Sequence, residues 1–228
     1  MADKPNFRTR TKAVVFDFDG TLAVLNIDFG LMRKRVLELM ERYGVKEEAV
    51  GEKYLLEMID QAHHLLSERK PSEAEVFVQE AHRILHAVEM KAAEKGELIP
   101  GTERMLKALR GRGIKVGIVT RNCEEAVRRI FPQIDGYCDV FVSRDTVKKV
   151  KPHPDHLDFV LKSFHVAGKE AVMVGDHPID VEAGKGAGME TIGVLTGRTG
   201  KEAFEKAGAD VILTEASEIQ RLLEGEER

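Results

Sequence analysis

The sequence predicts an α/β fold, in which a parallel sheet carries helices on both faces and an all-helical segment is inserted after the first strand. From residue 98 onward, short apolar stretches alternate with helical patterns, and this alternation is typical of parallel sheets. Residues 24–97 break the alternation and show only apolar spacings of helical period. We therefore expect an α/β core domain formed by residues 1–23 and 98–228 and a helical domain formed by residues 24–97.

The expected sheet begins with "AVVFD" (13–17), in which four apolar residues precede the first carboxylate. Such a run is typical of a strand that is buried on both faces. Five further stretches have the same character: residues 114–120, 137–143, 170–176, 190–195 and 209–214. Glycines stand where the intervening helices should end, because a residue without Cβ accepts the left-handed conformation that closes many helices: Gly113, Gly168, Gly188 and Gly208.

The inserted segment contains three apolar stripes, which are separated by "YGV" (43–45) and "RKPSEAE" (69–75). We interpret the stripes as faces that pack helix against helix. Ser72 is followed by Glu75 in a capping-box pattern, which predicts Ser72 as the N-cap of the third helix. The stripes consist of Phe29, Met32, Val36, Leu39, Met40 and Tyr43, then Tyr54, Leu55, Met58, Ile59, Ala62, Leu65 and Leu66, then Val76, Phe77, Ala81, Ile84, Leu85 and Val88.

Composition excludes several classes of protein. The formal net charge is -4 and the basic residues are spread along the chain, so no nucleic-acid footprint is expected. No stretch approaches the roughly 18 apolar residues of a membrane span, and the polar start lacks the apolar region of a signal peptide. Cys123 and Cys138 are too few for a disulfide framework and lack metal-type spacing. We expect a soluble cytoplasmic protein with no nucleic-acid or membrane partner.

Polar side chains follow several of the expected strands at the point where each strand ends. Because ligands of open parallel sheets bind outside the carboxyl ends of the strands, these side chains are expected to converge. Lys151 opens a helix after the third expected strand, residues 137–143. We therefore prefer Lys151 to the flanking Lys148 and Lys149 as the lysine of the site. The converging set comprises Asp17, Asp19, Thr120, Arg121, Asn122, Lys151, Asp176 and Asp180.

Three or four carboxylates brought together repel one another, so they need a counter-cation or must take up protons. Oxygen ligands of this kind suit Mg²⁺, and Mg²⁺ together with Lys151 would also neutralise a phosphate. Gly20 would let the backbone approach the ligand closely. Thr120 and the turn amides can donate to phosphate oxygens. This combination predicts phosphoryl transfer, with one of Asp17 and Asp19 as nucleophile and the other as general acid and base.

Four segments in this order resemble the motifs of the haloacid dehalogenase superfamily of phosphatases: "DFDGTL" (17–22), "VTRN" (119–122), "KPHPD" (151–155) and "GDHPID" (175–180). The resemblance spans residues 13 to about 195. It implies a Rossmann-like core whose inserted helices form a cap domain that selects the substrate. Residues 100–122 and 174–197 are most similar to the phosphoglycolate phosphatase branch, whose caps can mediate a homodimer.

The resemblance also implies roles for the site residues. It makes Asp17 the nucleophile, Asp19 the general acid and base, and Lys151 the group that stabilises charge on both nucleophile and phosphate. It assigns Thr120, with Asn122 helping, to the phosphoryl group. Its Mg²⁺ ligands are Asp17, the carbonyl of Asp19, and Asp176, with Asp180 either ligating the metal or supporting Lys151. Arg121 replaces a residue that is often Asn or Ser in the family and is expected to reach an anionic substrate.

The expected activity is therefore Mg²⁺-dependent hydrolysis of a small phosphorylated metabolite, such as a phosphoglycolate-like monoester, through an aspartyl-phosphate. A sugar phosphomutase and a nucleotide or pyrophosphate phosphatase remain alternatives within the superfamily. A non-catalytic phosphate-binding protein remains an alternative of another class. Ala23-Val24 replaces the polar pair that usually follows the first motif, so the resemblance leaves the substrate open.

Overall fold

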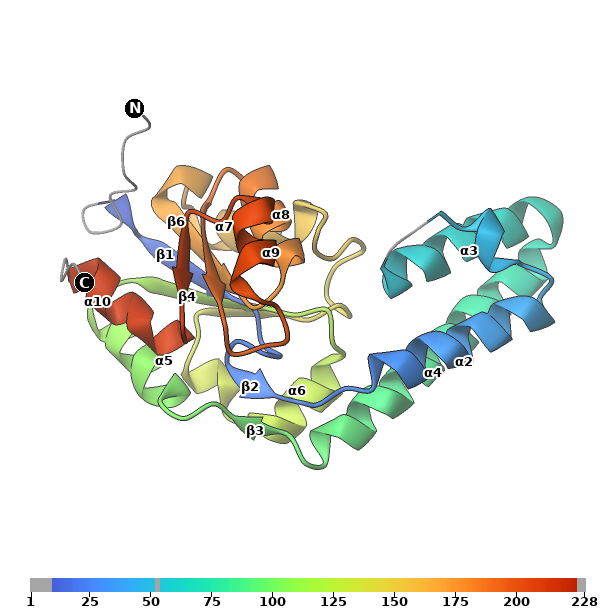
Figure 1. Ribbon diagram of the computed structural model, residues 1–228, viewed down its shortest axis with the longest axis horizontal. Helices are drawn as coiled ribbons and strands as arrows, with labels where there is room; N and C mark the ends of the chain where they lie inside the picture. Colours follow the sequence, from blue (N-terminus) through green and yellow to red (C-terminus); the bar gives the residue numbers. More distant parts are fainter. Residues whose placement is uncertain (1–9, 52–53, 225–228) are drawn as a thin grey trace. The chain divides into compact units, whose positions relative to one another are not determined.

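The computed structural model describes residues 10–51 and 54–224, and these residues form two compact units (Figure 1). The first unit combines the chain up to Leu25 with the chain from Lys95 onward, and the second unit is Asn26–Glu94. The predicted domain boundaries lie within a few residues of these two positions.

The first unit is built on a six-stranded parallel sheet in the order β5-β4-β1-β6-β7-β8, which confirms the predicted fold class (Figure 1). All four residues of β1 are fully buried, as their unbroken apolar character predicts for a central strand. The strands are β1 (Ala13–Phe16), β4 (Lys115–Val119), β5 (Val140–Val142), β6 (Ala171–Gly175), β7 (Glu190–Val194) and β8 (Val211–Leu213).

The strand order reverses at β1, because the chain adds β4 and β5 on one side of β1 and then β6, β7 and β8 on the other. At such a reversal the connections leave in opposite directions and open a crevice outside the carboxyl ends of the strands. The residues that directly follow β1, β4 and β6 are Asp17, Thr120 and Asp176. The topology therefore places these three residues around one crevice.

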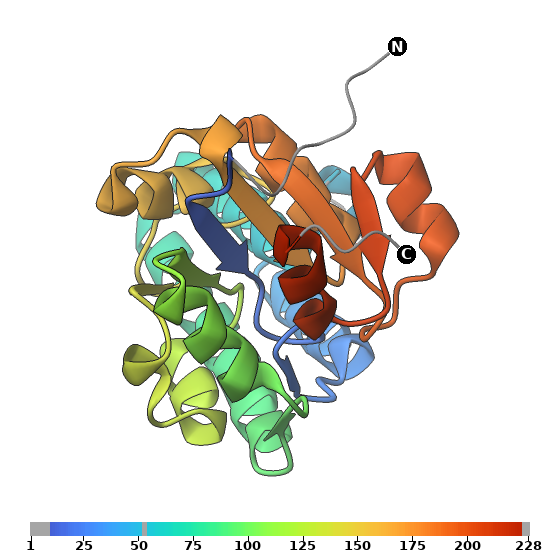
Figure 2. The ribbon, with the colours of Figure 1, turned by 90° about the vertical axis from the view of Figure 1, so that its left-hand side faces the viewer.

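Helices cover both faces of the sheet (Figure 2). On one face, α7 and α8 pack on the core strands, and Val160 of α7 fills the space that the missing side chain of Gly117 in β4 leaves. On the other face, α5 packs on β4 and lies beside the C-terminal α10 (Figure 2). The helices of this unit are α5 (Thr102–Gly111), α6 (Glu124–Ile130), α7 (Asp155–Phe164), α8 (Pro178–Gly186), α9 (Lys201–Ala207) and α10 (Ile219–Glu224).

A two-stranded antiparallel sheet joins the segments that lead into and out of the insert, where the sequence indicates no strand. It consists of β2 (Ala23–Val24) and β3 (Glu97–Leu98). The carbonyl of Leu22 extends this link, since it accepts hydrogen bonds from the Ile99 amide and the Thr102 hydroxyl, both at 2.9 Å. Two-residue strands are too short to leave a periodic pattern, which is why the sequence does not reveal them.

Three of the four predicted helix-ending glycines have positive φ, namely Gly113, Gly188 and Gly208. The prediction for Gly168 is wrong, because α7 ends at Phe164 and its C-cap is His165, which adopts the left-handed conformation with a φ of 53°. His is one of the few residues with a side chain that is enriched in this conformation. Gly168 instead begins the 3₁₀ turn Gly168–Glu170 that leads into β6.

The second unit consists of α2 (Phe29–Arg42), the 3₁₀ turn η1 (Glu47–Ala49), α3 (Leu55–Arg69) and α4 (Pro71–Ala93). Both α2 and α3 pack against α4, and the rings of Tyr43 and Phe77 meet edge to face at 5.5 Å between their centroids. These contacts confirm the helical insert and most of its predicted apolar faces. Phe29 and Val76 are exceptions, since they are 51% and 46% exposed.

The predicted N-cap Ser72 is wrong, because α4 already begins at Pro71, with Lys70 as its N-cap. Proline suits the first helical position, where its fixed φ is helical and its missing N–H would have no partner within the helix. The helix therefore starts at the proline, and Ser72 lies within its first turn.

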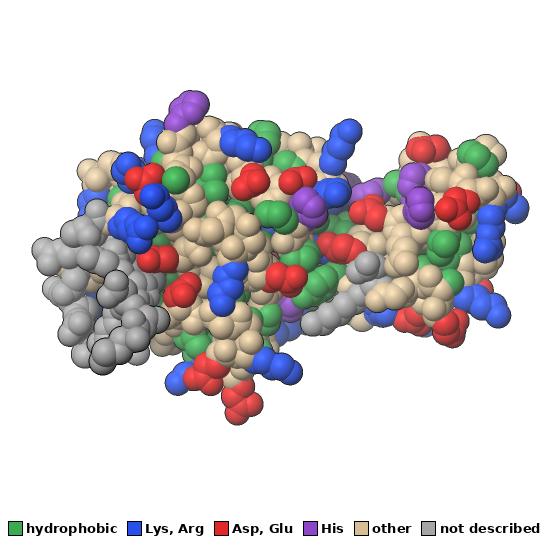
Figure 3. All heavy atoms as spheres, turned by 90° about the horizontal axis from the view of Figure 1, so that it is seen from above, with side chains coloured by type: hydrophobic (Ala, Val, Ile, Leu, Met, Phe, Trp, Pro, Cys, Tyr) green, Lys and Arg blue, Asp and Glu red, His purple; other side chains and the backbone are tan. Residues whose placement is uncertain are grey.

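None of the helices in the described part of the chain is long and apolar enough to cross a membrane. On the surface that Figure 3 shows, acidic and basic side chains lie among one another and form no large field of one sign.

Candidate active site

Three side chains from distant parts of the sequence meet at the crevice. The Lys151 Nζ atom lies 2.6 Å from Asp17 Oδ1, at the end of β1, and 2.6 Å from Asp180 Oδ1, in the first turn of α8. Lys151 is 1% exposed, so both ion pairs are shielded from water. The structure thus brings together the lysine and two of the carboxylates that the strand-end argument selects, whereas Lys148 and Lys149 are exposed.

Asp180 is held on both of its carboxylate oxygens. Oδ1 accepts from Lys151, and Oδ2 accepts from the backbone N–H of His177 at 3.1 Å, within a capping arrangement at the start of α8. β6 ends in Gly175, and a Cβ atom there would overlap the Asp180 carboxylate. These contacts favour the role of Asp180 as a support for Lys151. The ring of His177 caps α8, since its Nδ1 accepts from Ile179 N at 3.2 Å.

Asp176 is the carboxylate of the site that has no hydrogen-bond or ion-pair partner among the described residues. Gly20 and Gly197 leave room for it, because a Cβ atom added at either glycine would overlap its carboxylate. One oxygen each of Asp17, Asp176 and Asp180 lie within 4.8 Å of one another. A half-buried carboxylate of this kind, beside two others, is suited to receive a cation.

The electrostatics of the carboxylates also indicate a missing positive charge. Burial, followed by the charge of Asp180, raises the pKa of Asp17 to about 7 against the lowering effect of Lys151. Burial and the charges of Asp17, Asp180 and Asp19 raise the pKa of Asp176 to about 9. With one lysine for three carboxylates, the site retains protons at neutral pH unless a second cation enters.

Asp19 has different surroundings from Asp17. Its Oδ1 accepts from the Leu25 amide at 2.9 Å, and its carboxylate is not part of the three-carboxylate group. The turn that follows Asp19 requires Gly20, which has a φ of 83°, and the Thr196 hydroxyl donates to the Gly20 carbonyl at 2.5 Å. The prediction that Asp19 binds metal concerns its carbonyl, so the position of its carboxylate does not conflict with it.

The loop after β4 carries the predicted phosphate-binding residues. The Thr120 hydroxyl oxygen accepts from the Asn122 amide at 3.1 Å, and its proton has no acceptor among the described residues. Arg121 Nη1 donates to the Lys151 carbonyl, a contact that the sequence does not indicate. The Asn122 carbonyl accepts from the Arg144 amide at 3.3 Å. The contact of Arg121 with an anionic substrate stays a prediction.

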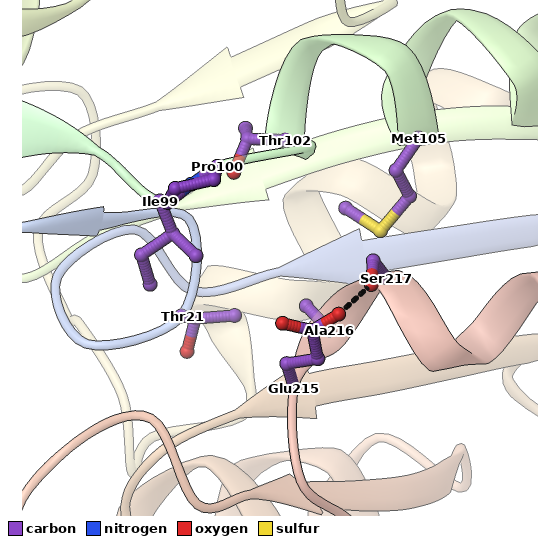
Figure 4. Close-up of a pocket in the computed structure, with 8 residues that line it drawn as sticks. All are labelled: Thr21, Ile99, Pro100, Thr102, Met105, Glu215, Ala216 and Ser217. Carbon is purple, nitrogen blue, oxygen red and sulfur yellow. Dashed lines mark hydrogen bonds between the residues drawn. The ribbon is translucent and has the colours of Figure 1, made fainter.

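Figure 4 shows a small pocket in the first unit. None of the carboxylates that surround Lys151 lines it. The buried hydroxyl oxygen of Thr21 has no hydrogen-bond partner among the described residues. The lining residues are Thr21, Ile99, Pro100, Thr102, Met105, Glu215, Ala216 and Ser217.

The residues fit a divalent cation with a preference for oxygen ligands. The donor set is made only of carboxylate oxygens, and the Asp176 carboxylate lies in space that two glycines leave open. Mg²⁺ takes one or two carboxylates and completes its shell with water and substrate phosphate. Asp17 and Asp176 are therefore the side chains that would hold it, because both oxygens of Asp180 already accept hydrogen bonds.

The chain is similar to known hydrolases and phosphatases over most of its length. The family model described as haloacid dehalogenase-like hydrolase matches residues 14–194. A haloacid dehalogenase-like hydrolase domain-containing protein of Arabidopsis thaliana is 32% identical over 96% of this chain and 86% of its own. A pyrophosphatase of Bacillus cereus is 30% identical over 94% of this chain and 97% of its own. A phosphoglycolate phosphatase of Shigella dysenteriae is 28% identical over 91% and 90%.

Solved structures share the fold. The structure of a hydrolase from Pseudomonas syringae superposes with a TM-score of 0.66 at 19% identity and covers 96% of this chain and 100% of its own. At this identity the likeness concerns the fold alone.

Proposed function

The chain belongs to the haloacid dehalogenase-like hydrolase family, and we propose that it is a Mg²⁺-dependent phosphatase of small phosphorylated metabolites. The observation that carries the proposal is the buried contact of Lys151 with Asp17 at 2.6 Å, in a group with the carboxylate of Asp176, which has no hydrogen-bond or ion-pair partner in the described part of the chain. Phosphoryl transfer requires little more than positioned charge around the phosphate, which this arrangement supplies.

Asp17 is the nucleophile of the proposed reaction. Its Oδ1 is held by Lys151, so the side chain is oriented and the charge of an incoming phosphate is offset. Asp17 is only 8% exposed, which supports attack by a largely desolvated carboxylate. In the first step a carboxylate oxygen of Asp17 bonds to phosphorus, and the bond from phosphorus to the leaving oxygen breaks.

Asp19 is the proton carrier. It lies two residues from Asp17, outside the three-carboxylate group. Lys151 is paired with Asp17 and Asp180, so a change in the protonation of Asp19 leaves those ion pairs in place. Asp19 gives its proton to the leaving oxygen in the first step and takes a proton from water in the second. The resulting hydroxide attacks phosphorus, the bond to Asp17 breaks, and inorganic phosphate leaves.

Mg²⁺ supplies Lewis-acid charge for the phosphate oxygens when it is bound. The protein orients the reaction around it through three residues. Thr120 can donate its hydroxyl proton to a phosphate oxygen, Lys151 offsets negative charge, and Asp180 holds Lys151 in place.

The proposed substrate is a small phosphate monoester of the phosphoglycolate type. The relative from Shigella dysenteriae that is named a phosphoglycolate phosphatase supports this choice. The relatives named pyrophosphatases favour inorganic pyrophosphate as the second candidate, which the same residues would cleave with phosphate as the leaving group.

Release of inorganic phosphate from a substrate panel tests the proposal. Purified protein with Mg²⁺ is offered phosphoglycolate, pyrophosphate, nucleotides and sugar phosphates without a sugar bisphosphate activator. We expect turnover that chelation abolishes, with the highest kcat/KM on phosphoglycolate or a similar monoester. A preference for pyrophosphate selects the second candidate. A requirement for a bisphosphate would indicate a phosphomutase, and no turnover on any substrate refutes the phosphatase proposal.

Removal of metal is expected to make stability fall as the pH rises. The pKa of Asp176 is about 9 in the folded protein, far above the ordinary value of 3.8 that the unfolded chain has. As the pH rises above about 4, the carboxyl group therefore ionises in the unfolded chain first, and this ionisation stabilises the unfolded state relative to the folded one. Urea unfolding with a chelator should therefore give a lower free energy of unfolding at pH 8 than at pH 5. Asp176→Asn should raise the metal-free value at pH 8 by about 1–2 kcal/mol, since asparagine has no proton to release when the chain unfolds.

Mg²⁺ provides the control for this prediction. It should stabilise the wild-type protein at pH 8, because it binds only the folded state, and it should stabilise Asp176→Asn much less. An Asp176→Asn protein that Mg²⁺ stabilises as strongly as the wild type would contradict the assignment of this carboxylate.

A further inference from the structure

His156 is a fully buried histidine that the proposed reaction does not use. It lies in the first turn of α7, and its residue is 0% exposed. Both ring nitrogens have backbone partners: Nδ1 lies 3.2 Å from the Lys151 amide nitrogen, and Nε2 lies 3.2 Å from the Val142 carbonyl oxygen.

These partners fix the tautomer of the ring. A backbone N–H can only donate, so Nδ1 must carry a lone pair toward Lys151. A carbonyl oxygen can only accept, so Nε2 must carry the proton toward Val142. An imidazolium would set two N–H groups against each other at Lys151. In agreement, burial and then the Lys151 charge lower the pKa of His156 to about 3.

The Val142 carbonyl connects this histidine to the phosphate-binding loop. The same oxygen accepts from the Thr120 amide at 3.0 Å, at the end of β4. Thr120 and Lys151, which are 31 positions apart in the chain, are thus joined through one carbonyl and one imidazole. On the other side of Lys151, Arg121 Nη1 donates to its carbonyl, so both polar groups of the Lys151 backbone are held by side chains.

We propose that His156 is a positioning residue that holds the Lys151 backbone in register with Thr120, so that the Lys151 ammonium and the Thr120 hydroxyl reach the same phosphoryl group. The proposal rests on the proposed phosphatase activity for its kinetic consequence, but its structural content does not depend on it. A misplacement on the order of 1 Å can cost up to about 100-fold in rate, so a residue that only holds the backbone can control kcat.

Two substitutions of His156 distinguish the roles of its two ring nitrogens. Asparagine places a carbonyl oxygen at about the distance from Cα at which histidine places Nδ1, so His156→Asn keeps an acceptor for Lys151 and loses the donor to Val142. Glutamine places an amide nitrogen near the position of Nε2, so His156→Gln keeps the donor to Val142 and loses the acceptor. The half-exposed His153 of the same segment provides the matched control, His153→Gln.

The kinetic test measures kcat and KM for a chromogenic phosphate ester with Mg²⁺. We expect His156→Gln to lower kcat about 10- to 100-fold with KM changed less than about 3-fold. His156→Asn should retain several times more activity than His156→Gln, and His153→Gln should match the wild type. Equal losses in His156→Asn and His156→Gln, or a larger loss in His156→Asn, would overturn the proposal, since a role in filling space or anchoring to Val142 predicts those results.

Two further measurements test the positioning role of His156 without requiring phosphatase activity. Long-range ¹H–¹⁵N NMR spectra of the wild-type protein should show one histidine in the neutral Nε2–H tautomer well below pH 6. Amide hydrogen exchange at Lys151 should be slow in the wild type and His156→Asn and at least 10-fold faster in His156→Gln. A His156 that titrates near pH 6.5, or Lys151 exchange that is unchanged in His156→Gln, refutes the positioning role. A wild-type protein without phosphatase activity refutes only the proposed function.

Discussion

Replacing Asp17 by asparagine is expected to reduce phosphate release by a factor on the order of 10³ or more, because an amide oxygen does not form the covalent bond to phosphorus. The side chain keeps its shape and an oxygen that can accept from Lys151 Nζ, so the effect on folding should be small. The measurement is kcat for a chromogenic phosphate ester with Mg²⁺, with circular dichroism to verify the fold.

Asp19→Asn is the comparison that separates nucleophile from acid and base. A leaving group that departs readily as an anion does not need the proton of Asp19, so this variant should still transfer the phosphoryl group to Asp17. It should then stall, because no carboxylate at position 19 deprotonates water. Rapid quenching and mass spectrometry should find phosphate on the peptide that contains Asp17 in Asp19→Asn and none in Asp17→Asn.

The opposite pattern would exchange the two roles. If Asp17→Asn accumulates a phosphorylated peptide and Asp19→Asn does not, then the contact of Asp17 with Lys151 serves only to hold the lysine. A variant Asp17→Asn that keeps more than a tenth of the wild-type kcat would remove Asp17 from the chemistry altogether.

The fold was predictable because the strands of a doubly covered parallel sheet have an unbroken apolar character. Val14 and Phe16 are buried on one face of β1 and Ala13 and Val15 on the other, so the run "AVVF" carries the signal of a central strand. The wrong predictions concern only the ends of two helices. Pro71 rather than Ser72 begins α4, and His165 rather than Gly168 caps the end of α7, because these residues can also adopt the backbone conformation that a helix end requires.

Ligands of open parallel sheets bind outside the carboxyl ends of the strands, and this rule was sufficient to predict that Asp17, Thr120 and Asp176 lie around one crevice. The rule needs only the strand boundaries and the parallel order of the strands. It does not reveal which side chains hold Lys151. Arg121 and His156 reach the Lys151 backbone through side-chain geometry, and no spacing in the sequence encodes a contact of that kind. The sequence also did not reveal Gly197, because the role of this glycine is to leave space for the Asp176 carboxylate.

Replacing Lys151 by methionine is expected to lower the free energy of unfolding by about 3–5 kcal/mol in the absence of metal. Lys151 is 1% exposed between Asp17 and Asp180, so methionine would fill the space but leave two buried carboxylates without their cation. Urea unfolding with a chelator measures the loss. The exposed Lys149 is the matched control, and Lys149→Met should change stability by less than about 0.5 kcal/mol.

A second substitution tests whether charge is the cause. If Lys151→Met destabilises because the carboxylates lose their cation, then Asp180→Asn should cost much less in that background than in the wild type, giving a coupling of at least about 1 kcal/mol. The penalty should also shrink as the pH falls from 8 to 5, because the pKa of Asp17 is already raised to about 7 with Lys151 present and rises further without it. Protonation then removes the repulsion, and the variant approaches the wild type. Additive losses that do not change with pH would instead show that Lys151 stabilises the core through packing. The proposed role of Lys151 in offsetting the charges of Asp17 and Asp180 would then lose its energetic support.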